Sequence, residues 1–423
     1  MSVVSADIPR PHGDPYAGAS RVVPFRLAVT LAAFGLYWLS AVILQARDAT
    51  LVFGADAHLY AMLMEGPVDR LTRFHPLTTA MVTVWLKLLA PLTVWIAPKL
   101  LFKALFAAVG AAGVWAAIGA LEAVGGRRHA LLWGIVYASA LSVWYFSSIE
   151  ESKIVTTTLT AFYIAVYLRL RTAWSLRDAA LLTGLLLLAC LNEIVAAFLV
   201  AIPAVDALVQ HGWNVRRQLR RNWWIACHAL AAPAAFLFLE LVVNGWLVPR
   251  DGDPEGASHL SMLLYYLARH ELSAAAVYDF ATRWLFFAIA APSIEATWGA
   301  GDNYMGDFPP GLMGYLGSPL TTALALVAGA ALAVSLLPRQ RGKISRDTAG
   351  LMLGLACCAL LRALFFFLVY PGEYMLFASA AVLPHLMLVA IPFAASAYPR
   401  KQGLLGGLAA LLFIVNGSFI LGP

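Results

Sequence analysis

The chain has 423 residues, of which 61% are hydrophobic and 12% are charged, and its formal net charge is +6. Its mean hydropathy is +0.77. These values exclude an ordinary soluble domain, which is about half apolar and about a quarter charged. Several apolar runs exceed the roughly 20 residues that cross a bilayer, and their continuity excludes a transmembrane β-barrel. We therefore expect an all-α polytopic membrane protein.

The cysteines and the positive charge give no sign of a metal or nucleic-acid site. All four cysteines lie inside apolar runs, without the spacing of metal ligands: Cys190, Cys227, Cys357 and Cys358. This pattern predicts neither a disulfide framework nor a zinc site. The basic residues lie in short segments between apolar runs, as membrane topology requires, so we expect no nucleic-acid partner.

The start of the chain predicts a polar tail followed by an uncleaved anchor. Residues 1–24 are polar and proline-rich, and we expect a disordered cytoplasmic tail there. The apolar run 25–45 is too long for a signal-peptide core and no small-residue cleavage site closes it. Residues 25–423 are then a single transmembrane domain, with outer loops at 46–98 and 249–318.

Basic clusters near the ends of the apolar runs set the expected topology, because arginine and lysine favour the cytoplasm. The clusters are Arg127-Arg128, Arg169 to Arg177, Arg216 to Arg221, Arg339 to Arg346 and Arg400-Lys401. Placing them inside with the N-terminus puts most of the 29 basic residues in the cytoplasm and most of the 23 acidic residues outside. We expect a multi-pass protein of the cell membrane, such as a bacterial inner membrane.

This layout requires two unusual segments. One of the three runs before Arg127 must fail to cross, and we assign that role to 76–97, which carries Lys87 and several prolines. It would lie at the outer interface or re-enter the membrane. Residues 178–209 lie between two inner clusters, so they must form a hairpin of two short helices with Asn192 and Glu193 at its tip. A carboxylate there predicts a water-filled recess.

The remaining chain adds further spans. We expect 222–248 to cross outward, WLFFAIAA in the loop 249–318 to form an interfacial helix, and spans at 319–337, 348–369, 375–396 and 402–421. The expected total is about eleven.

Polar residues from four segments converge on the outer side in this layout. Acidic candidates for catalysis are Asp56, Glu150 and Glu151. Candidates for substrate binding are His58, Tyr60, His75, Lys87, Lys103, Lys153, Asn192, Glu193, Arg362, Tyr370, Glu373 and Tyr374. An outer carboxylate is a suitable general base for an acceptor hydroxyl or amine, and nearby cations stabilise a phosphate leaving group. This pattern favours a donor whose lipid tail lies in the bilayer.

Structural roles compete with these assignments. Arg362 would pair equally well with a phosphate or with Glu240, which lies at a matching depth. Glu150 and Glu151 would each be simply solvated at a span end, and Asp56 would cap a helix. His58 and His75 would be ordinary loop histidines. Lys87, Lys99 and Lys103 would snorkel to lipid headgroups.

The order of segments resembles the membrane glycosyltransferases of the GT-C fold. These include the protein O-mannosyltransferases, the lipid A aminoarabinose transferase and the oligosaccharyltransferase catalytic subunits. FGADAHLYAMLMEG resembles their acidic first outer loop, through Asp56 and Tyr60, and His75-Pro76-Leu77 resembles their H-P-P-L turn with one proline replaced. SSIEES resembles their acidic second outer loop, and EYMLFASAAVLPHL resembles a late tyrosine–proline segment through Tyr374 and Pro384.

The resemblance implies an inverting sugar transfer from a polyprenyl-phosphate donor, with Asp56 as the base or acceptor-orienting group, on the periplasmic or exterior side. The acceptor would be a lipid, glycan or protein, and membrane lipids would surround the chain. The first outer loop has no D-x-D, so we expect no obligatory metal or other cofactor, while a divalent metal stays an alternative.

Two other functions remain open at this point. In a transporter or flippase of a lipid-linked or anionic solute, Arg362, Glu240 and Glu193 would line a path. The absence of an inverted repeat in the sequence counts against it. A non-catalytic subunit of an assembly complex is the third alternative, and it predicts that Asp56→Ala leaves function intact.

Overall fold

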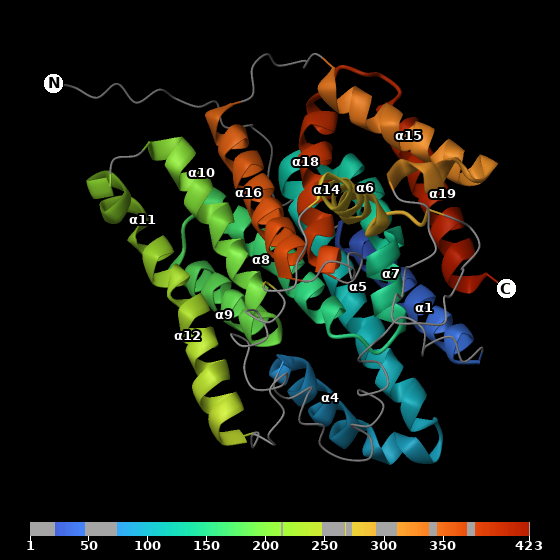
Figure 1. Ribbon diagram of the computed structural model, residues 1–423, viewed down its shortest axis with the longest axis horizontal. Coiled ribbons are helices and arrows are strands. Elements are labelled where there is room, and N and C mark those ends of the chain that lie inside the picture. Colours follow the sequence, from blue (N-terminus) through green and yellow to red (C-terminus); the bar gives the residue numbers. More distant parts are fainter. Residues whose placement is uncertain are drawn as a thin grey trace.

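The described parts of the chain form a bundle of helices (Figure 1). The computed structural model describes residues 22–46, 74–212, 215–247, 267, 273–292, 311–337, 345–369 and 377–422. The regular elements within these ranges are α-, 3-10 and π-helices, which confirms an all-helical fold. Asp56, His58, Tyr60, Tyr370, Glu373 and Tyr374 lie outside the described residues, as does almost all of the predicted N-terminal tail.

The first half of the bundle consists of α1 (Val22–Ala46), α4 (Pro76–Leu89), η3 (Ala90–Val94), α5 (Pro98–Gly125), α6 (Arg127–Ser139), α7 (Leu141–Ser148), α8 (Lys153–Thr172), α9 (Leu176–Asn192), η4 (Ile194–Val200) and α10 (Ala201–His211). Proline occupies the first turns of α4 and α5, where its missing N–H has no intrahelical partner to lose. Gly126 has φ +73° and lets the chain reverse between α5 and α6.

The second half consists of α11 (Val215–Ala229), α12 (Ala231–Leu237), η5 (Phe238–Leu247), α14 (Ala274–Thr282), η7 (Arg283–Phe287), η8 (Gly311–Leu316), α15 (Pro319–Leu336), α16 (Arg346–Val369), η9 (Ser379–Ala381), α18 (Val382–Ala395) and α19 (Lys401–Leu421). Serine side chains cap α9, α14 and α15 by accepting a hydrogen bond from a first-turn N–H.

Helix α8 lies at the centre and defines two ends of the bundle. It packs against α5 and α9 and is buried along nearly its whole length. The start of α8 lies beside Asn192 and Glu193, where the Asn192 Nδ2 donates to the Ser152 carbonyl (3.0 Å). The end of α8 lies beside Asp206, which pairs with Arg171 (2.5 Å). We call these the Glu193 end and the Asp206 end. Its 20 residues span about 30 Å, the thickness of a hydrocarbon core.

The described basic clusters gather at the Asp206 end. Arg169 contacts Asp178 (3.4 Å), Arg127 contacts Glu122 (3.9 Å), and Arg26 lies within electrostatic range of both Glu122 and Arg169. The expectation that the basic loops share one side is therefore consistent with the fold. That this side is cytoplasmic stays a prediction.

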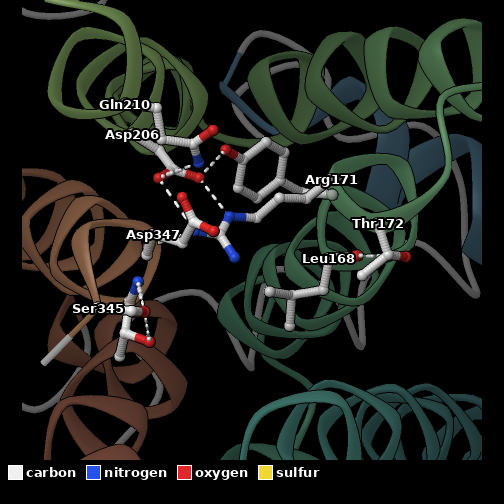
Figure 2. Close-up of polar contacts among 9 residues, drawn as sticks. Leu168, Arg171, Thr172, Asp206, Gln210, Ser345 and Asp347 are labelled. Carbon is white, nitrogen blue, oxygen red and sulfur yellow. Dashed lines mark hydrogen bonds and ion pairs between the residues drawn. The ribbon is translucent and has the colours of Figure 1, made fainter. Parts of the chain in front are cut away.

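A saturated polar network closes the Asp206 end (Figure 2). Asp206 is fully buried; its Oδ2 accepts hydrogen bonds from Tyr167 and Arg171 (both 2.5 Å), and its Oδ1 accepts from Gln210 (2.8 Å) and Arg171 (3.3 Å). Arg171 also donates to the Asp347 carbonyl. The network joins α8, α10 and α16, and it leaves neither Asp206 oxygen unpaired.

The hairpin predicted for 178–209 is confirmed. Helix α9 ends at Asn192, and Glu193 has extended backbone angles (φ −157°, ψ 109°) before η4 and α10 return to the Asp206 end. The sequence predicted this hairpin because arginine clusters flank the apolar stretch at both ends, and both clusters are expected on the same side of the membrane.

Fewer described helices than the predicted total of about eleven spans meet the criteria of length and hydropathy, and the number that cross stays a prediction. Among the described residues, eight helices are long and apolar enough to cross, or nine if the bent pair α6–α7 is one span. Helix α9 and the segment Ser379–Ala395 are only 17 residues long, and α8 is rich in threonine and arginine. Conversely, Pro76–Val94 meets the criteria although we predicted that it does not cross. Figure 1 shows α4 across one end of the bundle.

The segment WLFFAIAA packs one side into the bundle, while Leu285 and Phe286 are 45% and 41% exposed; its expected place at a membrane interface stays a prediction. Trp284 and Phe287 are each 2% exposed, and Trp284 stacks on Phe366 of α16. The chain inserts at the 57° bend between α6 and α7, where Leu141 donates to the Ile289 carbonyl (2.9 Å). The buried Asn416 of α19 completes the junction by bonding Ser139, Ile289 and Ala291. Backbone groups freed by the bend are thus satisfied.

Two glycines let α10 and α16 approach closely. Gly350 and Gly354 are four residues apart on α16, which is the small-residue spacing of close helix pairs in membranes. A Cβ on Gly354 would lie 2.6 Å from the Ile202 carbonyl oxygen of α10. This spacing explains how Asp206 reaches Arg171 and the start of α16 together.

We expect Gly354→Ala to destabilise the protein by about 1–3 kcal/mol, because the added methyl group must push α10 away from α16. The measurement is the unfolding midpoint in detergent. Gly329→Ala on α15 is the matched control, since nothing lies within 4 Å of its Cβ position. Equal midpoints for the two variants would contradict the close packing.

Candidate functional site

The Glu193 end contains a cluster of buried charged residues from five parts of the chain. Its members are all at most 7% exposed: Lys103, Glu150, Glu151, Lys153, Glu193 and Arg362. Burying a charge is expensive unless it is paired and hydrogen-bonded. The sequence named all six as candidates, and the fold brings them to one end of the bundle.

Lys103 and Glu150 form a buried ion pair at 3.0 Å, joining α5 to the link between α7 and α8. The side chain of Lys103 is 0% exposed and that of Glu150 is 2% exposed. Snorkelling of Lys103 to headgroups and solvation of Glu150 are therefore both wrong. The second oxygen of Glu150, Oε1, has no hydrogen-bond partner among the described residues.

Glu151 is also inside the protein rather than at a solvated span end. It is 1% exposed, and the Ser152 hydroxyl donates to its Oε1 (3.0 Å). Two acidic residues that are adjacent in the sequence are thus both buried, in the short link that precedes α8. Burial of consecutive carboxylates is costly and marks this link as a candidate site rather than an ordinary loop.

Glu193 and Arg362 form the second buried ion pair, with 2.6 Å between Arg362 Nη2 and Glu193 Oε1. Arg362 also donates from Nε to the Phe377 carbonyl (2.9 Å) and lies over the Phe366 ring. Its carboxylate partner is Glu193, so the alternative pair with Glu240 is wrong. Glu193 Oε2 has no hydrogen-bond partner among the described residues.

Lys153 is a buried cation that forms no ion pair with any described residue. It is 5% exposed, and its Nζ lies 4.6 Å from the centroid of the Phe377 ring. Within the described ranges it makes no hydrogen bond or salt bridge, although it lies within electrostatic range of Glu193. An ammonium that lies against a ring face and donates no hydrogen bond to a described residue keeps its N–H donors for an added anion.

The start of α4 is fastened to this cluster. His75 Nδ1 donates to the Asn192 carbonyl (2.7 Å), and the Thr78 hydroxyl donates to Asn192 Oδ1 (2.5 Å). His75 is 8% exposed and lies within electrostatic range of Glu193. His75, which follows the Asp56 segment in the sequence, therefore lies beside the buried charges.

Lys87 is not brought into the cluster. It lies on the exposed side of α4, more than two helical turns after Thr78. Its interpretation as a headgroup contact is consistent with that exposure.

Phe377 and Thr78 belong to the cluster and were not predicted. Phe377 supplies a carbonyl to Arg362 and a ring to Lys153, and it directly follows the segment that holds Tyr370, Glu373 and Tyr374. The sequence signal for these two residues was their position just after the H-P-L and E-Y-M motifs. They were missed because neither a phenylalanine ring nor a threonine hydroxyl carries a charge.

Cavities and metal ligands give no further assignment. A cavity with room for about one water molecule lies beside Arg362, lined otherwise by apolar side chains and Thr160. Within the described residues, no three His, Cys, Asp or Glu side chains are grouped to hold a metal ion. The expectation that no metal is required stays a prediction.

Comparison with known proteins adds no family to this geometry. No protein-family model matches the chain. No curated protein matches it at a significant level. The resemblance to GT-C enzymes therefore rests on the short sequence motifs alone.

We expect Arg362→Met to cost about 3–5 kcal/mol, because it leaves the Glu193 carboxylate buried without its partner. The double variant Glu193→Gln with Arg362→Met should recover most of that loss. The measurement is a double-mutant cycle on unfolding free energy in detergent.

Arg127→Met is the control for this cycle, because its pair with Glu122 is long and partly exposed and should contribute at most about 1 kcal/mol. Additive losses from Glu193→Gln and Arg362→Met would show that the two side chains do not depend on each other.

Proposed function

We propose that this chain is an integral-membrane glycosyltransferase that moves one sugar from a polyprenyl-phosphate donor to a lipid, glycan or protein acceptor outside the cytoplasm. The observation that carries the proposal is the one-sided cluster at the Glu193 end. There, buried acids whose second oxygens have no partner among the described residues lie near a buried lysine that forms no ion pair with those residues. Such an array is suited to move a proton and to stabilise an anion in the same place.

The chemistry follows from the charges. A carboxylate base, for which Asp56 is the sequence candidate, accepts the proton of the acceptor hydroxyl or amine. The acceptor atom then bonds to the anomeric carbon as the bond from that carbon to the phosphate oxygen breaks. The departing polyprenyl phosphate keeps the electron pair, and its new charge is stabilised by Lys153 and by Arg362. Attack opposite the leaving group inverts the anomeric carbon.

The buried acids have complementary roles in this proposal. Glu193 holds Arg362 in place through their ion pair, and Lys103 does the same for Glu150. The unpartnered oxygens of Glu150 and Glu193 are then available to bind sugar or acceptor hydroxyls. A hydroxyl donor satisfies a carboxylate oxygen without adding charge.

Transport of a lipid-linked or anionic solute is the second candidate, because polar side chains continue along α8. At mid-length, the buried Tyr163 hydroxyl bonds His228 (2.7 Å), and His228 also bonds Thr183 (3.1 Å). The saturated network around Asp206 argues against a path through that end, since its opening would strand a buried carboxylate.

The discriminating experiment measures sugar release from a mixed set of polyprenyl-phosphate sugars by purified protein. We expect wild type to turn over at least one donor, and Asp56→Asn to lose about 100-fold or more because the base is removed while its size is kept. Asp178→Asn, at the opposite end of the bundle, is the matched control and should retain turnover.

Donor binding without turnover, in the presence of varied acceptors, would instead support transport. Equal turnover by Asp56→Asn and wild type would remove Asp56 as the base. Failure of wild type to bind or process any donor would contradict both candidates and favour a non-catalytic subunit.

A further inference from the structure

Asn192 occupies the point where three segments of the candidate site meet. Its side chain is fully buried. The Nδ2 group donates to the Ser152 carbonyl (3.0 Å) and to the Thr156 hydroxyl (2.8 Å), and Oδ1 accepts from Thr78 (2.5 Å). Both amide protons are used inside the protein, so the side chain has none left to donate to a substrate.

The main chain of Asn192 continues this arrangement. Its carbonyl accepts from His75, and the next residue is Glu193, whose N–H bonds the Ala189 carbonyl (2.8 Å) as α9 ends. The direction in which Glu193 leaves the helix is therefore set at Asn192. One residue thus contacts the start of α4 and the start of α8 and directly precedes the Glu193–Arg362 pair.

We propose that Asn192 is the positioning residue of this site, a role that rests on the proposed function. It holds the start of α4 at His75 and Thr78, the link that carries Glu150 to Lys153, and Glu193 in one fixed arrangement. In this proposal Asn192 does not touch the substrate. The positioning role therefore replaces the substrate-binding role that the sequence suggested for it. Because rates depend steeply on the placement of reacting groups, loss of this arrangement should act mainly on the chemical step.

A second buried asparagine provides a matched control. Asn416 also makes three side-chain hydrogen bonds to neighbouring segments, at the bend between α6 and α7, away from the charged cluster. Asn192→Leu and Asn416→Leu each remove three buried bonds with little change in volume. Both should lower the unfolding midpoint by similar amounts.

The kinetic experiment compares these variants on the donor that wild type uses. Asn192→Leu should lower kcat about 10- to 100-fold while the donor KM changes less than about threefold. Asn416→Leu should keep kcat within about twofold of wild type. If Asn192→Leu does not fold, Thr78→Val and Thr156→Val each remove one of its bonds, and each should lower kcat with the same split. Equal kcat losses in the two asparagine variants would overturn the proposal.

A hydrogen-exchange measurement tests the positioning without any activity. Asn192→Leu should speed exchange in residues 76–82 and 152–158 together, whereas Asn416→Leu should act on 137–143 and 287–291. Unchanged exchange in 76–82 in Asn192→Leu would also overturn the proposal. If wild type shows no turnover with any donor, the glycosyltransferase proposal fails, and this measurement still decides whether Asn192 couples the segments.

Discussion

The charges of Glu193 and Arg362 lie inside a bundle of apolar helices, where neither is stable without the other. Several features at this end follow from their pairing. Helix α9 ends before Glu193, so that the carboxylate at the tip of the hairpin faces α16. Arg362 of α16 donates a hydrogen bond to the Phe377 carbonyl, and the Phe377 ring lies against Lys153. The pair thus links the hairpin, α16 and the segment after it into one site.

The two ends of the bundle use buried charge in different ways. At the Asp206 end, both carboxylate oxygens are saturated and two glycines let the helices close around them. At the Glu193 end, Glu150 and Glu193 each keep an unpartnered oxygen among the described residues, and Lys153 forms no ion pair with any of those residues, although it lies within electrostatic range of Glu193. A saturated network contributes stability, whereas an incomplete one is retained at a cost and marks a candidate site. This contrast is the physical basis for placing the proposed chemistry at one end.

Sequence patterns predicted the helical fold, the hairpin and six of the charged residues that converge, because hydropathy and positive charge act along the chain. Lys87 is not among the six, and Asp56 and Glu373 lie outside the described residues. The patterns did not predict partners. Glu193 and Arg362 are 169 residues apart, and Lys103 and Glu150 are 47 apart. No local pattern distinguishes a lysine that pairs inside from one that snorkels. The contacts of the buried side of WLFFAIAA were missed for the same reason, since they come from α7, α16 and α19.

The central claim is that the Glu193 end binds a lipid-linked phosphate through Lys153. The most direct measurement compares the binding of polyprenyl phosphate and of the uncharged polyprenol to purified protein in lipid nanodiscs. Wild type should prefer the phosphate by at least about tenfold, equivalent to about 1.4 kcal/mol. Lys153→Met should lose most of this preference, and Arg127→Met at the other end should keep it. An undiminished preference in Lys153→Met would contradict the account.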